Sequence, residues 1–300
     1  MRSGGAGGRH LRGAEPYLLL LPAVITLVLV AAGPLAYLLY LGFTEWSLEK
    51  GQSVWIGLRN YLVLFGESPY FWGSLRTTLI FVAAVVVSET LLGFALALLV
   101  ERLGRGRGIV RVLFLVPVVL TPIVSALTWK TLVFHSTSGF LTYLRYLVGL
   151  PPIGYLDSAT GALVSVIAAD IWHWTPFVML TILAGLASLP REPFEAAVVD
   201  GANGLQIMWH VRIPLLLPVL AVAVIFRTVD AYRTFDMIFA LTGGGPGTST
   251  MILPLLTYQT AFQYFRLGEG AALAVLTALM SFATVMALML LFRRARAGVV

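Results

Sequence analysis

The sequence predicts an all-α membrane protein that crosses the bilayer about six times. Of its 300 residues, 59% are hydrophobic and 11% are charged, whereas a water-soluble domain averages about 45–50% apolar and about 25% charged residues. The apolar residues occur in continuous runs of at least the roughly 20 residues that a helix needs to cross the hydrocarbon core. These runs lack an alternation with period two, which favours helices over a transmembrane β-barrel.

The first apolar run extends from Tyr17 to about Phe43, after a Gly- and Arg-rich leader at residues 1–14 that we expect to be disordered and cytoplasmic. A cleaved signal peptide has an apolar core of about 7–15 residues and a small-residue cleavage site, whereas this run is longer and continues into Glu45 and Trp46. We therefore expect a retained span. Five further spans are expected, at about 79–100, 112–134, 162–186, 215–241 and 271–292.

Together the six spans are predicted to form a single transmembrane domain over residues 15–300. Prolines inside the spans, such as Pro122 in the third, are expected to kink their helices. The sequence contains no cysteine, which excludes thiolate metal sites, iron–sulfur clusters and cysteine nucleophiles.

Lysine and arginine are distributed unequally between the two sets of connectors. The leader, the second-to-third connector, the fourth-to-fifth connector and the C-terminal tail together hold twelve, and the opposite connectors hold six. Cytoplasmic loops carry the excess of Lys and Arg, so both termini are predicted to be cytoplasmic. We attribute the net charge of +6 to membrane topology, and we expect no nucleic-acid partner.

The connector between the fourth and fifth spans, residues 190–214, is not a plain loop. Pro193 suits a first helical position, and Asp200-Gly201 is a typical helix stop. A second helix is predicted to start after Asn203 and to stop at Pro214. A helix–break–helix unit at the cytoplasmic face of a membrane either lies on the lipid or fits a groove in a partner protein, and acidic residues in its first half favour the partner.

The same connector resembles a motif of a known transporter family. That motif, the EAA loop in the membrane subunits of binding-protein-dependent ABC importers, has the form E-A-A, three residues, G, nine residues, I-x-L-P. Its spacing is matched by Glu195-Ala196-Ala197, Gly201 and Val211-Arg212-Ile213-Pro214, with Val211 and Ile213 as conservative departures.

The resemblance extends beyond this loop. The segments Leu241–Gly247 and Gly57–Tyr61 resemble the sugar-permease branch of the family, so that the similarity covers about residues 15–295. Within that branch the chain resembles the first of two non-identical permease subunits of the maltose, trehalose and glycerol-3-phosphate type. The resemblance implies the type I ABC importer permease fold, in the cell (inner) membrane of a bacterium or an archaeon.

The resemblance also implies partners. These are a second homologous permease subunit, a cytoplasmic ATPase dimer and an extracellular or periplasmic sugar-binding protein. By family position the residues that contact the ATPase are Glu195, Ala196, Ala197, Asp200 and Gly201. Neither lysine of the chain, Lys50 or Lys130, follows a G-x-x-x-x-G sequence, so there is no phosphate-binding loop and a partner must hydrolyse ATP. We expect no catalytic residue, cofactor or metal site in this chain.

Charged side chains inside the spans mark the expected substrate pathway. A charge at the bilayer centre costs at least about 2.5–3.5 kcal/mol on insertion scales, so such residues normally face protein or water. The fifth span carries four charges of alternating sign at three-residue spacing, which gives three potential couplings along one side of a helix. The candidate pathway residues are Glu89, Asp170, Trp172, His173, Trp174, Arg227, Asp230, Tyr232, Arg233 and Asp236.

Two interpretations of these charges remain open. In one, they line a polar cavity in which carboxylates and guanidinium groups bind sugar hydroxyls while an aromatic ring stacks on the sugar. In the other, they compensate one another and allow the helices to pack. His173 equally suits a hydrogen-bonded core position. The buried charges sum to −2, which disfavours an anionic substrate.

The predicted function is that of a permease subunit that imports a sugar, with a disaccharide such as trehalose or maltose favoured. An ion-coupled secondary carrier is the alternative, because intramembrane Asp and His residues can relay protons. Such a carrier would not need the cytoplasmic coupling loop at residues 190–214, which in ABC importers links the permease to its ATPase. A membrane enzyme ranks last, because the sequence shows neither G-x-S-x-G nor a cluster of His and carboxylates at metal-ligand spacing.

Overall fold

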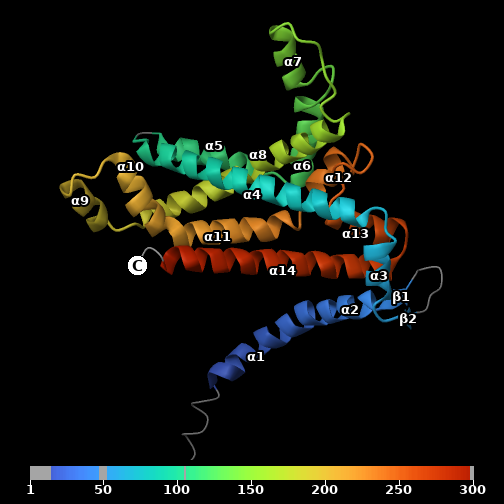
Figure 1. Ribbon diagram of the computed structural model, residues 1–300. Helices are drawn as coiled ribbons and strands as arrows, with labels where there is room; N and C mark the ends of the chain where they lie inside the picture. The colour runs from blue at the N-terminus through green and yellow to red at the C-terminus, as the bar shows by residue number, and fades with distance from the viewer. Residues whose placement is uncertain (1–14, 47–52, 105, 298–300) are drawn as a thin grey trace, which may run out of the picture.

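The computed structural model describes residues 15–46, 53–104 and 106–297. The leader at residues 1–14 lies outside the described residues, so the expectation made for it stays a prediction. Four long helices run side by side as a bundle (Figure 1): α4 (Phe71–Arg102), α8 (Ala159–Ala187), α11 (Ile213–Ala231) and α14 (Leu267–Ala297).

Shorter elements extend and connect these four helices. The helices are α1 (Glu15–Leu27), α2 (Gly33–Gly42), α3 (Arg59–Gly66), α5 (Arg107–Val119), α6 (Pro122–Thr128), α7 (Phe140–Leu147), α9 (Glu192–Val199), α10 (Gly204–Ile207), α12 (Asp236–Leu241) and α13 (Leu253–Tyr258). The π-helical segments are η1 (Val28–Ala32), η2 (Trp129–Val133), η3 (Met208–Arg212) and η4 (Gln259–Gln263). Strands β1 (Thr44–Trp46) and β2 (Ser53–Trp55) pair antiparallel with Thr44 opposite Trp55, a hairpin that the sequence did not predict.

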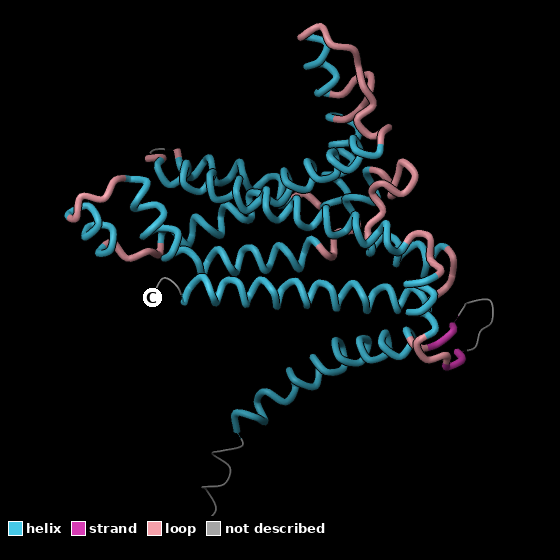
Figure 2. The backbone as a smooth tube through the Cα atoms, in the orientation of Figure 1, coloured by secondary structure: helices cyan, strands magenta, loops and turns pink. Residues whose placement is uncertain are grey.

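Five helical stretches among the described residues are long and apolar enough to cross a membrane, and a bent pair would be a sixth. This confirms the prediction of an all-α membrane protein, with five to six spans where about six were expected. The five stretches are Tyr17–Gly42, Phe71–Arg102, Ala159–Ala187, Gly204–Ala231 and Leu267–Arg296. Figure 2 shows loops at the two ends of the bundle and along the arm that carries α7, with helix between them.

The third span is not the single helix that the sequence predicted. It consists of α5 and the stretch Pro122–Val133, which are bent by 96° relative to each other. The bend lies where Pro122 was expected to kink the helix. Leu120 and Thr121 are both extended, with ψ of 143° and 145°, because a proline cannot donate to the helix and disfavours a helical residue before it.

The fifth span also departs from expectation at both ends. It begins at Gly204, because the chain continues through η3 past Pro214 where we had expected a stop. The wider π-helical turn just before the proline accommodates its missing N–H group. It ends at Ala231, not near residue 241, because the last backbone bonds tighten to the i−3 carbonyl and Phe235 is not helical.

The core is formed by close contact between α4 and α8. Gly93 on α4 lies against Val178, and a Cβ atom placed on Gly93 would come within 2.8 Å of that side chain. Small residues at such positions let membrane helices approach closely. Two groups of buried side chains follow, one around Phe81 and Tyr232 and one around Ile182 and Leu216.

The first span lies apart from this core. In the most apolar part of the stretch Tyr17–Gly42, no residue is buried. Figure 1 shows α1 diverging from α14. Only α2 packs on α14, near the β-hairpin. The bundle thus has one end that carries α9 and α10 and an opposite end that carries the β-hairpin (Figure 1).

Candidate functional site

A single buried arginine joins three helices in the middle of the bundle. Arg227 on α11 donates from Nε to Glu89 Oε2 on α4 at 2.5 Å and from Nη2 to Glu89 Oε1 at 3.0 Å. Its Nη2 also donates to Asp170 Oδ2 on α8, and its Nη1 donates to Asp230 Oδ2 at 2.9 Å. The bidentate geometry with Glu89 is the strong form of an arginine–carboxylate pair.

This buried charge cluster, which we define as Glu89, Asp170, Arg227 and Asp230, is closed to solvent at its centre and partly exposed at its edge. The side chains of Glu89 and Arg227 are fully buried, whereas that of Asp230 is 29% exposed. The ring of Trp174 covers the guanidinium, with the Arg227 Cζ atom 5.0 Å from the ring centroid, a distance at which a cation attracts an aromatic face.

A small cavity opens beside the exposed edge of the cluster. Its volume is about 110 Å³, and its lining combines charged and aromatic groups: Pro122, Asp170, Trp174, Asp230, Arg233, Thr234, Phe235, Asp236 and Met237. Ligand pockets for whole small molecules have volumes of about 300–1,000 Å³. The cavity is therefore at most part of a binding site for a small molecule, and further residues would have to complete that site.

The four charges of the predicted fifth span do not form a ladder along one helix. Arg227 and Asp230 are paired, but α11 ends at Ala231, and Asp236 lies in the first turn of α12. An acidic residue in that position stabilises the start of a helix. Within the described residues, Asp230 and Arg233 form no ion pair within 4 Å, nor do Arg233 and Asp236. They face the same cavity instead.

The structure brings together seven of the ten candidate pathway residues and separates three. Glu89, Asp170, Trp174, Arg227, Asp230, Arg233 and Asp236 belong to the cluster or its cavity. His173 is buried, and its Nδ1 lies 3.0 Å from Ser125 Oγ. Trp172 packs against Trp129, and the Tyr232 hydroxyl lies 2.9 Å from Thr284 Oγ1.

Three cavity residues were not predicted from the sequence to line the pathway, namely Pro122, Thr234 and Met237, whereas Phe235 was expected there as an aromatic ring that could stack on the substrate. The backbone break after Ala231 places Thr234 and Phe235 there, and no signal in the sequence announced this break. Among the described residues, no group of three or more His, Cys, Asp or Glu side chains is arranged to hold a metal ion.

The connector that resembles the EAA loop projects from one end of the bundle (Figure 1) as two helices with a sharp break. Gly201 has φ of +78°, a conformation that glycine adopts without the steric penalty of other residues. Asn203 caps the second helix, accepting from the backbone N–H groups of Leu205 and Gln206, and the Gln206 side chain accepts from the Asn203 N–H. The predicted end of the first helix at Asp200-Gly201 and the predicted start of the second helix after Asn203 are thus confirmed.

The outer surface of this coupling segment, which we define as residues 192–212, is apolar and uncovered. Val198, Val199, Leu205 and Trp209 are 61% to 87% exposed. Glu195, Ala196, Asp200 and Gly201 are also exposed, and Ala197 is half-buried. An exposed apolar surface next to acidic groups has the composition of a protein contact.

An ion pair anchors the coupling segment to the bundle. Arg212 Nη1 donates to Glu101 Oε2, on the last turn of α4, at 2.7 Å. The Arg212 guanidinium also lies 5.7 Å from the ring centroid of Phe194 on α9. These three side chains line a cavity of about 470 Å³ between α9 and the bundle. Neither Glu101 nor Phe194 was singled out from the sequence, because their proximity depends on the fold.

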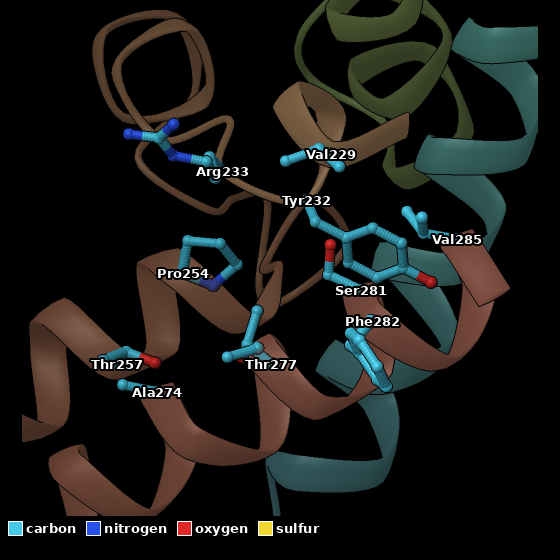
Figure 3. Close-up of a pocket in the computed structure, with 11 residues that line it drawn as sticks. Val229, Tyr232, Arg233, Pro254, Thr257, Ala274, Thr277, Ser281, Phe282 and Val285 are labelled. Carbon is cyan, nitrogen blue, oxygen red and sulfur yellow. The ribbon is translucent and has the colours of Figure 1, made fainter. Parts of the chain in front are cut away.

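A third and larger cavity lies between the end of α11, α13 and α14. Its volume is about 570 Å³, and Figure 3 shows its lining, in which Tyr232, Phe282 and Val285 lie around one end and Arg233 points away from the other residues. This cavity shares Arg233 with the small polar cavity, but its lining is otherwise largely apolar.

Comparison with known proteins places these features in a family. Residues 89–297 match the family model described as "Binding-protein-dependent transport system inner membrane component". The chain is 40% identical over 268 residues to a probable ABC transporter permease protein, y4oQ, of Sinorhizobium fredii, covering 89% of this chain and 86% of that protein. It is 36% identical over 264 residues to the trehalose/maltose transport system permease protein MalF of Thermococcus litoralis, covering 87% and 88%.

A solved structure shares the fold. A chain of a bacterial ABC transporter involved in the import of the acidic polysaccharide alginate superimposes with a TM-score of 0.80 at 21% identity, over 94% of this chain and 96% of that chain. The type I arrangement expected from the sequence is thus observed in the fold itself.

Proposed function

Because this chain belongs to the family of binding-protein-dependent transport system inner membrane components, we propose that it is the permease subunit that carries a neutral sugar across the membrane in an ABC importer. A disaccharide such as trehalose or maltose is the favoured substrate. The observation that carries the proposal is the coupling segment, residues 192–212, whose exposed apolar surface beside acidic groups has the composition of a protein contact.

The coupling segment supplies the link to an ATPase. In this proposal Glu195, Ala196, Ala197, Asp200 and Gly201 contact a cytoplasmic ATPase dimer, which hydrolyses ATP on behalf of this chain. Gly201 forms the break that presents the apolar surface. The end of the bundle with α9 and α10 is then cytoplasmic, as are both termini, and the β-hairpin end faces an extracellular or periplasmic sugar-binding protein.

The anchor of the coupling segment suggests how its movement reaches the substrate. Arg212 and Arg227 lie on one continuous helical stretch, and both pair with α4, through Glu101 and Glu89. Two tie points at different depths make α4, α11 and the coupling segment one rigid unit. A displacement of the segment by the ATPase therefore moves the buried charge cluster and the adjacent cavity.

The cavity beside Asp230 supplies part of the substrate site. Asp230, Arg233 and Asp236 offer charged hydrogen-bonding groups, and Trp174 and Phe235 offer rings, the combination that binds a sugar. Its volume of about 110 Å³ is too small for a disaccharide, so a second homologous permease subunit completes the site. The excess of carboxylates disfavours an anionic substrate.

Reconstitution tests the proposal. The tagged chain is purified with the subunits that co-elute, placed in vesicles and supplied with its binding protein and labelled trehalose or maltose. We expect uptake that requires ATP and survives an uncoupler. Co-elution of an ATPase should be lost in Glu195→Lys and Gly201→Val variants. A lone chain that transports sugar and is stopped by an uncoupler would instead establish the ion-coupled carrier.

A further inference from the structure

The seam between α11 and α14 contains a groove that shares no lining residue with the proposed sugar site. Its volume is about 210 Å³, and one face of each helix lines it: Leu217, Pro218, Ala221 and Ile225 from α11, and Met289, Phe292, Arg293 and Arg296 from α14. All of these side chains are apolar except the two arginines, which lie three residues apart near the end of α14.

The two arginines form no ion pair with any other residue that the structure describes. Among the described residues, neither Arg293 nor Arg296 has a carboxylate within 4 Å. They differ in this respect from Arg212 and Arg227, which are paired. A groove that ends in two unpaired guanidinium groups favours an occupant with an apolar body and an anionic end.

The length of the groove matches one leaflet of a bilayer. From Leu217 to Ile225 the helix rises about 12 Å at 1.5 Å per residue, and half of a hydrocarbon core of about 30 Å is about 15 Å. One helical turn further along each helix, at Val229 and Val285, the cavity of about 570 Å³ begins. The end of a chain that follows the groove would therefore arrive beside Val285 and Phe282 (Figure 3).

The charge at one end of the groove distinguishes its occupant. An apolar transmembrane helix would leave Arg293 and Arg296 without a counter-charge, whereas an alkyl chain with an anionic head places a negative group beside both. The groove of about 210 Å³ is narrow and lies along about 12 Å of helix, which suits a single alkyl chain.

We propose that this groove binds an anionic phospholipid, with its phosphate between Arg293 and Arg296 and one acyl chain along Ala221, Ile225 and Met289. Basic pockets between transmembrane helices are recognised sites for anionic lipid head groups. In the topology proposed above the lipid belongs to the cytoplasmic leaflet, but the binding itself does not depend on the transport function. The lipid fills the seam between the helix that carries the charge cluster and its neighbour.

Native mass spectrometry of the purified complex, after exchange into detergent with palmitoyl-oleoyl-phosphatidylglycerol, tests the proposal. We expect one retained lipid per copy of this chain, and at least a tenfold loss of occupancy in the Arg293→Gln/Arg296→Gln variant. Arg294→Gln is the matched control, since this arginine lies on the same turn but does not line the groove. Ala221→Trp fills the groove and should also expel the lipid, whereas Val222→Trp, on an outward face, should not.

Three results would overturn the proposal. Equal retention in Arg293→Gln/Arg296→Gln and wild type would show that the arginines do not hold the head group, and an equal loss in Arg294→Gln would show only a general attraction of charge. If Ala221→Trp removed the second permease subunit while the lipid count stayed unchanged, the seam would belong to a partner helix. Size-exclusion chromatography of every variant identifies any that fail to fold. The conservative pair, Arg293→Lys/Arg296→Lys, keeps both charges and should keep the lipid, so a loss of the lipid from this folded variant would also contradict the proposal.

Discussion

The continuous helix from Gly204 to Ala231 carries two arginines that both reach α4, and their surroundings differ. Arg227 meets Glu89 where both side chains are fully buried, whereas Arg212 meets Glu101 where 23% and 29% of the side chains are exposed. An exposed ion pair contributes about 0–1 kcal/mol, while removal of one member of a buried pair costs about 3–5 kcal/mol. The deep pair therefore holds helices together, and the shallow pair mainly sets a position.

Arg227→Met tests the deep side of this comparison and should have the largest effect. The substitution leaves the carboxylates of Glu89 and Asp170 buried without a cation, so we expect a loss of about 3–5 kcal/mol of stability. Thermal unfolding of the purified complex measures it. Arg227→Lys, which keeps the charge without the bidentate geometry, should have a stability between those of Arg227→Met and the wild type. Wild-type stability in Arg227→Met would show that the carboxylates are not held as anions.

Asp230→Ala separates stability from transport within the same cluster. The Asp230 side chain is 29% exposed and faces the cavity, and Arg227 keeps Glu89 and Asp170 as partners without it. We expect the complex to assemble with at most about 1 kcal/mol of lost stability, while sugar uptake falls at least about tenfold, as for the loss of about 1.4 kcal/mol of transition-state binding.

Asp230→Asn is the control for that experiment. It keeps the shape and one acceptor oxygen but replaces the other oxygen with an NH2 donor and removes the charge, so partial uptake is expected. Normal uptake kinetics in Asp230→Ala would remove this carboxylate from the substrate site and leave the cluster with a structural role alone.

The two regions also differ in how far the sequence could predict them. The coupling segment is continuous in the chain, and its breaks depend on local chemistry: the glycine at 201 and the cap at Asn203 were both predicted and are both observed. The cluster depends on side chains up to 138 residues apart, so the sequence identified its charged members without showing which of them meet. The same limit hid the pairing of Arg212 with Glu101.

The errors in the spans have local causes that composition does not reveal. The third span bends at Pro122, where a kink was expected, but through extended residues that divide the predicted helix in two, and the fifth ends at Ala231 although apolar residues continue beyond it. Apolar content predicts which segments can lie in the membrane, but the backbone hydrogen bonds determine where each helix ends. Because α11 ends at Ala231, Arg233 and Asp236 lie outside it and line the small cavity.

Gly201→Val tests the shallow region at its break, with an intermediate effect. The φ of +78° at Gly201 costs an L-residue roughly 1–2 kcal/mol, and a β-branched side chain is disfavoured further. Because a Cβ atom here would meet no other atom of the described residues within 4 Å, the penalty inside this chain is one of backbone conformation. We expect ATPase co-elution to fall at least about fivefold while the bundle unfolds at the wild-type temperature.

Gly201→Asn is the matched variant, since asparagine tolerates the left-handed region better than valine. It should retain most of the association. If both variants bound the ATPase as the wild type does, the break at Gly201 would not present the coupling surface.

A charge exchange between Arg212 and Glu101 sharpens the comparison and should have the smallest effect on stability. Arg212→Glu and Glu101→Arg each place like charges at the anchor, and we expect a change of about 1 kcal/mol or less in unfolding. Transport per ATP hydrolysed should nevertheless fall several-fold, because the coupling segment moves without α4. The double variant restores opposite charges and should recover the ratio, whereas a pair that only stabilised the fold would change unfolding and uptake in proportion. The same exchange between Arg227 and Glu89 should not recover, since burial leaves no room for the altered geometry.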